Sequence, residues 1–169
     1  MEFHTEGRAH RMGDDINTDH IISSSRKKET LDPHRLKEFL FEGSRPGFAA
    51  TVEEGDVLVA GANFGCGSAM EVAVTTLMAT GIHVVLASSF ARTYYRNALN
   101  NGLIPVECDV AGIEDGDRVT VDLSGEEVHV ANLTRGVAIR AERLSEMAQE
   151  LLGAGGIVAL VRERGGLGL

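Results

Sequence analysis

Short apolar runs alternate along the middle of the chain with segments whose apolar residues recur at helical spacing. Residues 57–60, 82–89 and 103–108 are short, mostly apolar and rich in β-branched side chains, which predicts buried strands. Between them, residues 69–81 and 90–102 have the spacing of helices, and each segment ends in a glycine, as helices often do. This order of elements predicts a βαβαβ unit with a parallel core.

Two flanking segments follow other patterns. Residues 115–130 alternate valines with polar residues on both sides of a Ser-Gly-Glu-Glu turn, which predicts an antiparallel hairpin. Residues 30–43 predict a helix, with Thr30 or Asp32 as its N-cap and Pro33 in its first turn.

The two ends of the chain carry weaker patterns. Residues 8–22 begin as a polar loop rich in Gly and Asp, and residues 23–29 continue as an exposed basic loop. Residues 141–156 predict a terminal helix, and residues 157–164 predict a last short strand or helix. The glycine-rich tail, residues 165–169, is expected to be flexible.

These patterns together predict one α/β domain over residues 1–169. Its ordered core is expected to run from about residue 10 to about residue 160, with an antiparallel appendage beside the parallel strands. A chain of 169 residues can bury an ordinary core without disulfides.

Charge and cysteine content narrow the class of protein. A net charge of -9 disfavours a nucleic-acid partner. The sequence holds no run of 18 apolar residues that would span a membrane, and its first ten residues lack the apolar core of a signal peptide. We therefore expect a cytoplasmic protein with reduced thiols, whose two cysteines, Cys66 and Cys108, are too few for an iron-sulfur cluster.

The stretch GANFGCGSAME, residues 61–71, joins a predicted strand to a predicted helix and is the strongest candidate for chemistry. Its glycine spacing does not fit a dinucleotide fingerprint, and it has no phosphate-loop lysine after the last glycine. Cys66 precedes a helix start, but no histidine lies near it in the sequence, so a packing role is the better interpretation.

Two interpretations of the same stretch stay open on the residues alone. Backbone N–H groups at a helix start attract carboxylates or phosphates, and the glycines let the backbone approach such a group closely. Alternatively, Ser68 as N-cap and Glu71 three residues later form a capping box that only starts the helix. Without further information the capping box is the favoured interpretation.

Three motifs considered together resemble one family. The motifs DDINTDHII, GANFGCGSAMEVA and SSFARTYYRNALNNGLIPV, in this order and spacing, resemble the small subunit of 3-isopropylmalate dehydratase and the swivelling domain of aconitase and homoaconitase. The resemblance runs from about residue 10 to about residue 160. It implies a three-layer β/β/α swivelling domain and a hydro-lyase that removes and re-adds water on a hydroxy di- or tricarboxylic acid, with leucine biosynthesis as the expected pathway.

The resemblance also implies roles for particular residues. Ser68 would be the catalytic base, and Asp19 matches an aspartate of the family's active-site loop, with an Asx-turn as the alternative. Thr18, His20, Gly65 and Gly67 would help to bind the substrate. No metal ligand is expected in this chain, because a 4Fe–4S cluster is expected on a large partner subunit, in a heterodimer or heterotetramer.

The basic segment lies where the family discriminates between substrates. By spacing, Lys28 matches an arginine that meets a distal carboxylate in homoaconitase-like members, and Arg26 and Lys27 lie beside it. The three cations either recognise an extra anionic group of the substrate or form a solvated face. Arg92, at the start of a helix, is a further candidate for substrate binding.

The glycine-rich turn departs from the family pattern. The family usually has Gly-Ser-Ser-Arg-Glu, whereas this chain has Ala69 for the second serine and Met70 for the arginine. That arginine normally contributes to holding a substrate carboxylate, so its loss puts the usual substrate in doubt. A homoaconitase-type or dimethylmalate dehydratase-type subunit and a non-catalytic carboxylate-binding paralogue therefore stay open as alternatives.

Overall fold

The computed structural model describes residues 2–125 and 127–166. This part of the chain contains seven strands and seven α-helices. The strands are β1 His4–Arg11, β2 Val57–Ala60, β3 Val84–Ala87, β4 Ile104–Glu107, β5 Arg118–Asp122, β6 His129–Asn132 and β7 Val137–Ile139. The α-helices are α1 Thr18–Ile21, α2 Ser24–Glu29, α3 Pro33–Leu36, α4 Val72–Met78, α5 Arg92–Asn101, α6 Glu146–Ala154 and α7 Ile157–Arg164, and the short 3₁₀ helices are η1 Lys37–Phe39, η2 Phe48–Thr51 and η3 Val110–Gly112.

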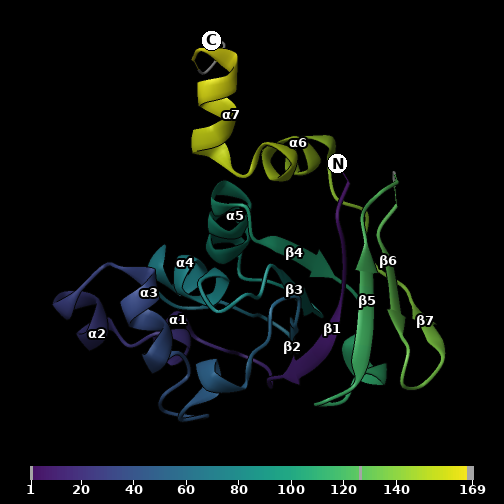
Figure 1. Cartoon of the computed structure of the whole chain (residues 1–169), viewed down its shortest axis with the longest axis horizontal. Helices are drawn as coiled ribbons and strands as arrows, with labels where there is room; N and C mark the ends of the chain where they lie inside the picture. Colours follow the sequence, from purple (N-terminus) through teal and green to yellow (C-terminus); the bar gives the residue numbers. More distant parts are fainter. Residues whose placement is uncertain (1, 126, 167–169) are drawn as a thin grey trace.

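One mixed sheet runs through the molecule in the order β4-β3-β2-β1-β5-β6-β7. Strands β1 to β4 are parallel, and β5 to β7 continue the sheet in antiparallel fashion. Strand β1 joins the two halves, because it pairs with β2 on one edge and with β5 on the other (Figure 1). The predicted parallel core and antiparallel hairpin are both confirmed.

The parallel strands lie in the middle of three layers. Along β2, Val57 and Val59 belong to a core shared with β5, β6 and α6, whereas Leu58 and Ala60 belong to a core shared with α1, α3 and α4. This alternation places apolar side chains on both faces, as parallel strands require. The antiparallel strands cover one face, and α1, α3, α4 and α5 supply the core on the other, which confirms the β/β/α arrangement (Figure 1).

The sequence patterns did not predict strand β1. Its side chains include His4, Glu6, Arg8 and His10, so it does not show the apolar run of a central strand. The polar groups are accommodated individually: the buried His10 lies with Nε2 2.7 Å from Asp56 Oδ2. Polar side chains with dedicated partners can therefore occupy a strand at the centre of a sheet.

Other boundaries differ from those predicted. The basic segment is not a loop but the helix α2. Its N-cap is Ser23, whose side chain accepts a hydrogen bond from the Ser25 backbone N–H. The helix predicted over residues 30–43 is shorter, only α3 and η1, although Asp32 is its N-cap and Pro33 its first residue as predicted. Strand β7 was not predicted, and residues 157–164 form a helix.

Two further observations concern the ends of the chain and its helices. Of the predicted flexible tail, residues 167–169 lie outside the described residues. Among the helices that the structure describes, none has the length and apolar content needed to cross a membrane.

The close approach of β1 to the start of β2 gives a test of the sheet. A Cβ atom on Gly7 would lie 2.2 Å from the Gly55 carbonyl oxygen, and backbone atoms cannot move aside cheaply. We predict that Gly7→Ala lowers the free energy of unfolding by at least about 2 kcal/mol, measured by urea denaturation. Gly112→Ala is the control, because a Cβ atom there meets nothing within 4 Å; equal stability of the two variants would contradict this packing.

Candidate active site

The candidate site lies where β1 and β2 end. Because these strands are parallel, the segments that follow them leave the sheet at the same edge, where open α/β sheets bind ligands. The residues after β1 contain the Asp-rich motif, and the residues after β2 form the glycine-rich turn. The fold therefore brings together two motifs that are about 50 residues apart in the sequence.

Backbone hydrogen bonds join the two segments along their length. The Gly65 N–H donates to the Ile16 carbonyl oxygen at 2.8 Å, and the Thr18 N–H donates to the Cys66 carbonyl oxygen at 2.8 Å. The Thr18 hydroxyl donates to the Ser68 carbonyl oxygen, also at 2.8 Å. Thr18 is buried, so this hydroxyl positions the turn and does not point into solvent.

Two glycines in the turn have backbone conformations that other residues rarely adopt. Gly65 has φ +80° and Gly67 has φ +95°. A Cβ atom on Gly65 would lie 2.1 Å from the Tyr94 ring, and one on Gly67 would lie 2.5 Å from the Asn17 side-chain amide. These positions therefore need glycine both for their dihedral angles and for the close approach of α5 and of the Asp-rich segment.

The turn leaves a series of backbone donors without acceptors. Among residues 2–125 and 127–166, nothing accepts a hydrogen bond from the N–H groups of residues 67–71, and nothing binds the Ser68 hydroxyl. Ser68 is exposed. A serine hydroxyl flanked by unpaired N–H groups is suited to hold negative charge, either its own or that of a carboxylate.

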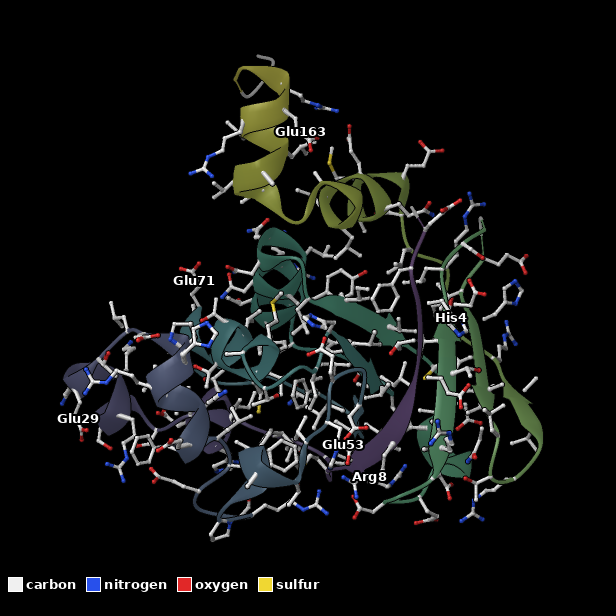
Figure 2. All side chains as sticks on the ribbon, in the orientation of Figure 1. His4, Arg8, Glu29, Glu53, Glu71 and Glu163 are labelled. Carbon is white, nitrogen blue, oxygen red and sulfur yellow. The ribbon has the colours of Figure 1, made fainter. Side chains whose placement is uncertain are left out.

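The predicted capping box is wrong. Helix α4 begins at Val72 with Glu71 as its N-cap, and no side chain caps it. Glu71 is exposed and points away from the helix layer (Figure 2). Because α4 begins four residues after Ser68, the Ser68 hydroxyl is not used to start the helix and stays available for chemistry.

Asp19 lies on α1 and is held by Ser24. Both the backbone N–H and the hydroxyl of Ser24 donate to Asp19 Oδ1, the former at 2.9 Å. These hydrogen bonds lower the pKa of Asp19 below its usual value, with a smaller contribution from the nearby Lys27. No described residue hydrogen-bonds Oδ2, so this oxygen of an ionised carboxylate remains open.

Residues near Asp19 show how α1 is built. Asn17 caps α1, accepting a hydrogen bond from the Asp19 N–H at 2.9 Å. His20 is exposed, and its Nδ1 accepts a weak hydrogen bond, at 3.4 Å, from the Asn17 backbone N–H, which completes a capping box. Sequence reasoning missed Asn17 and Ser24; the signals were an Asn two residues before Asp19 and a run of serines that begins four residues after it.

The three cations of α2 are not equivalent. Arg26 donates to Glu42 through both Nε, at 3.1 Å, and Nη2, at 2.9 Å, and it stacks 3.9 Å above the centre of the Phe39 ring. Any contact of Arg26 with substrate would first require this pair to open. Lys27 and Lys28 are exposed, and their contact with substrate stays a prediction.

Arg92 lines a different cavity from Asp19. It is the first residue of α5 and lines a separate cavity of about 250 Å³ with Phe90, Tyr95, Arg96 and Glu107. Asp19 and His20 instead line a cavity of about 450 Å³ to which Arg92 does not contribute. The structure thus brings Asp19, His20, Thr18, Gly65, Gly67 and Ser68 together. The contact of Arg92 with substrate stays a prediction, although Ala91 beside it donates to the Phe64 carbonyl oxygen of the turn at 2.9 Å.

The two residues that depart from the family pattern have different surroundings. Ala69 is exposed at the turn, whereas Met70 is buried in the core with Val72, Ala73 and Leu77. Met70 therefore stabilises the helix layer and offers nothing to a carboxylate. Of the cysteines, Cys66 is half-buried within the turn, and burial raises the pKa of Cys108 to about 12.

Comparisons with known proteins agree with this geometry. Residues 23–111 match the aconitase C-terminal domain. The chain is 44% identical to the methanogen homoaconitase small subunit of Methanocaldococcus jannaschii, over 94% of this chain and 92% of that protein. It is also 44% identical to the 3-isopropylmalate dehydratase small subunit of Caldicellulosiruptor bescii, over 93% of this chain and 94% of that protein.

A solved structure agrees with the fold over almost the same length. The crystal structure of a 3-isopropylmalate dehydratase subunit from Methanocaldococcus jannaschii superposes with a TM-score of 0.91 and 42% identity, covering 96% of both chains. A curled mixed sheet with its two motif loops at one edge is thus the architecture of the aconitase C-terminal domain class. The chain belongs to this family, within its branch of 3-isopropylmalate dehydratase small subunits, which are hydro-lyase subunits.

The hydroxyl that links the two segments can be tested on its own. Thr18→Val keeps the shape of the side chain and removes the hydrogen bond to the Ser68 carbonyl. We predict a loss of about 1 kcal/mol in the free energy of unfolding, together with a fall in turnover because Ser68 is no longer fixed. Thr18→Ser should retain both properties, and a Thr18→Val variant with unchanged turnover would show that this bond does not position Ser68.

Proposed function

We propose that the chain is one half of an active site that dehydrates and rehydrates a hydroxy di- or tricarboxylic acid, with Ser68 as the base. The observation that carries this proposal is the Ser68 hydroxyl, free of any described partner, within the series of unpaired N–H groups of residues 67–71. The 3-isopropylmalate dehydratase small subunits among its relatives support a branched alkyl malate as substrate, in leucine biosynthesis.

Serine is a weak base until it loses its own proton. The unpaired N–H groups of the turn supply the electrostatic stabilisation that a serine alkoxide needs. They do so without reorganisation, because hydrogen bonds to the Asp-rich segment already hold the turn in place. The alkoxide then takes the proton from the carbon next to a substrate carboxylate, and the reverse reaction returns it. The same N–H groups bind the carboxylate on which negative charge accumulates.

Asp19 acts on the opposite part of the reaction. Since its pKa is lowered, the carboxylate is ionised at neutral pH, and its open Oδ2 accepts a hydrogen bond from the substrate hydroxyl or from the water that leaves. Thr18 and His20 support this arrangement, Thr18 through the Ser68 carbonyl and His20 from its exposed position on α1. Lys27, Lys28 and Arg92 are the exposed cations available for further carboxylates.

The residues of this chain do not suit an iron-sulfur cluster. No group of three or more His, Cys, Asp or Glu side chains that could hold a metal ion occurs among the described residues, and the buried Cys108 lies in a different core from the turn of Cys66. The small-subunit names of the relatives support a 4Fe–4S cluster on a large partner subunit. When bound, such a cluster binds the substrate hydroxyl as a Lewis acid.

A homoaconitase-type or dimethylmalate dehydratase-type reaction is the second candidate. The relative from Methanocaldococcus jannaschii that is named a homoaconitase small subunit supports the first of these, since its 44% identity to this chain equals that of the isopropylmalate dehydratase subunit from Caldicellulosiruptor bescii. A carboxylate-binding role without catalysis would explain Ala69 and Met70, but it leaves the free Ser68 hydroxyl without a purpose. We propose a cytoplasmic location, as for other enzymes of this metabolism.

Replacing the base gives the direct test of the proposal. We predict that Ser68→Ala in the reconstituted two-subunit complex lowers kcat by about a hundred- to ten-thousand-fold, with little change in stability, because Ser68 is exposed and its hydroxyl has no described partner. The absorbance of the unsaturated acid measures turnover. Ser88→Ala, at an exposed serine after β3, is the matched control, and near-wild-type rates for Ser68→Ala would refute the assignment.

A further inference from the structure

A cavity of about 450 Å³ adjoins the Asp19 carboxylate. Its walls include Ile16, Asp19, His20 and Ser23 from the segment after β1, and Phe39 and Glu42 from the segment after α3. Asp19 therefore belongs both to the candidate active site and to the wall of this cavity. A substrate whose hydroxyl group contacts Asp19 would direct its remaining substituent toward the cavity.

Arg26, which contacts two residues of the cavity wall, is already paired. Both residues that Arg26 contacts line the cavity: Glu42 accepts two hydrogen bonds from its guanidinium, and Phe39 lies beneath it. A bidentate pair of this kind is among the stronger ion pairs, and the half-buried position of both side chains limits screening by water. The pair lowers the pKa of Glu42, so its carboxylate is ionised at neutral pH.

The other contact of Arg26 is weaker. Glu29 lies three residues further along α2, with Oε1 3.5 Å from Arg26 Nη1, and it is mostly exposed at the outer end of that helix (Figure 2). Removing Glu29 would leave the two Glu42 hydrogen bonds intact. Removing Glu42 would leave Arg26 without its main partner, beside the cavity.

The charges of the cavity wall disfavour an anionic occupant. Asp19 and Glu42 place two carboxylates on the wall, Arg26 is committed to one of them, and neither Lys27 nor Lys28 lines the cavity. A third carboxylate placed here would be desolvated beside these two carboxylates, and no described Lys or Arg side chain lines the wall to pair with it. An alkyl group would instead contact Ile16 and Phe39.

We propose that Glu42 is a specificity-determining residue, which keeps Arg26 from binding an anionic substituent and so reserves this cavity for an uncharged alkyl group. The inference rests on the proposed function, because it assigns the substituent of the same substrate. Glu42 acts through Arg26 and is a positioning residue. Removing the charge of Glu42 should change which acids bind and should leave the dehydration step itself intact.

The test uses Glu42→Gln in the complex with the large subunit. Its kcat and KM are compared with wild type for isopropylmalate and for homocitrate, whose extra group ends in a carboxylate. We expect the ratio of kcat/KM, homocitrate over isopropylmalate, to rise about tenfold or more, mainly through a lower KM for homocitrate. Glu42→Asp, which retains the charge, should restore most of the wild-type ratio.

Two controls separate this effect from a general disturbance of α2. Glu29→Gln removes the outer partner of Arg26 and should leave the ratio within about twofold of wild type. The double variant with Glu42→Gln and Arg26→Gln should lose the gain for homocitrate, because the freed cation is then absent. A ratio unchanged in Glu42→Gln, or changed equally in Glu29→Gln, would overturn the proposal.

Binding of unreactive acids keeps the inference separate from the proposed function. Calorimetry of the complex with propane-1,2,3-tricarboxylate and with isopropylsuccinate measures the same preference without turnover. A selective gain for the tricarboxylate in Glu42→Gln supports the inference even if Ser68 is not the base. If instead Lys28→Ala alone abolishes tricarboxylate binding in both backgrounds, Lys28 reads the distal group and Glu42 does not.

Discussion

The pairing of β1 on both of its edges is the constraint on which the site depends. Its parallel bonds to β2 direct the Asp-rich segment and the glycine-rich turn to one edge of the sheet, and its antiparallel bonds to β5 attach the second half of the fold. Gly7 permits the close contact with Gly55 that this position requires, and the buried His10 and Asp56 satisfy each other. Without this strand, the segments that carry Asp19 and Ser68 would not be held side by side.

Much of this architecture could be predicted from the sequence, and the remainder depended on contacts between distant residues. Strands β2 to β4 were predictable because their apolar runs report burial directly, and the end of α5 at Gly102 was predictable from local helix chemistry. Strand β1 was missed because its polar side chains find partners some 46 residues away. The same reason explains α2, whose Arg26 is paired with Glu42 rather than with solvent.

The candidate site shows a similar division. The motifs indicated Ser68 and Asp19, but the preferred local explanation of Ser68, a helix cap, failed because α4 begins only at Val72. The sequence also could not show that Met70 is buried in the helix-side core, which explains how the turn tolerates an apolar residue in place of an arginine. Backbone N–H groups, which carry no residue signature, supply much of the electrostatic environment instead.

The central claim is that this chain contributes a serine base and a backbone cradle to a hydro-lyase whose metal chemistry resides on another subunit. Anaerobic reconstitution with the cognate iron-sulfur large subunit, followed by ultraviolet absorbance of the unsaturated acid, tests it most directly. The panel would contain isopropylmalate, homocitrate, dimethylmalate and citrate. We expect the complex to turn over at least one of these acids, neither subunit to do so alone, and the activity to require Ser68. A stable complex that turns over none of them, or one that is equally active with Ser68→Ala, would contradict it.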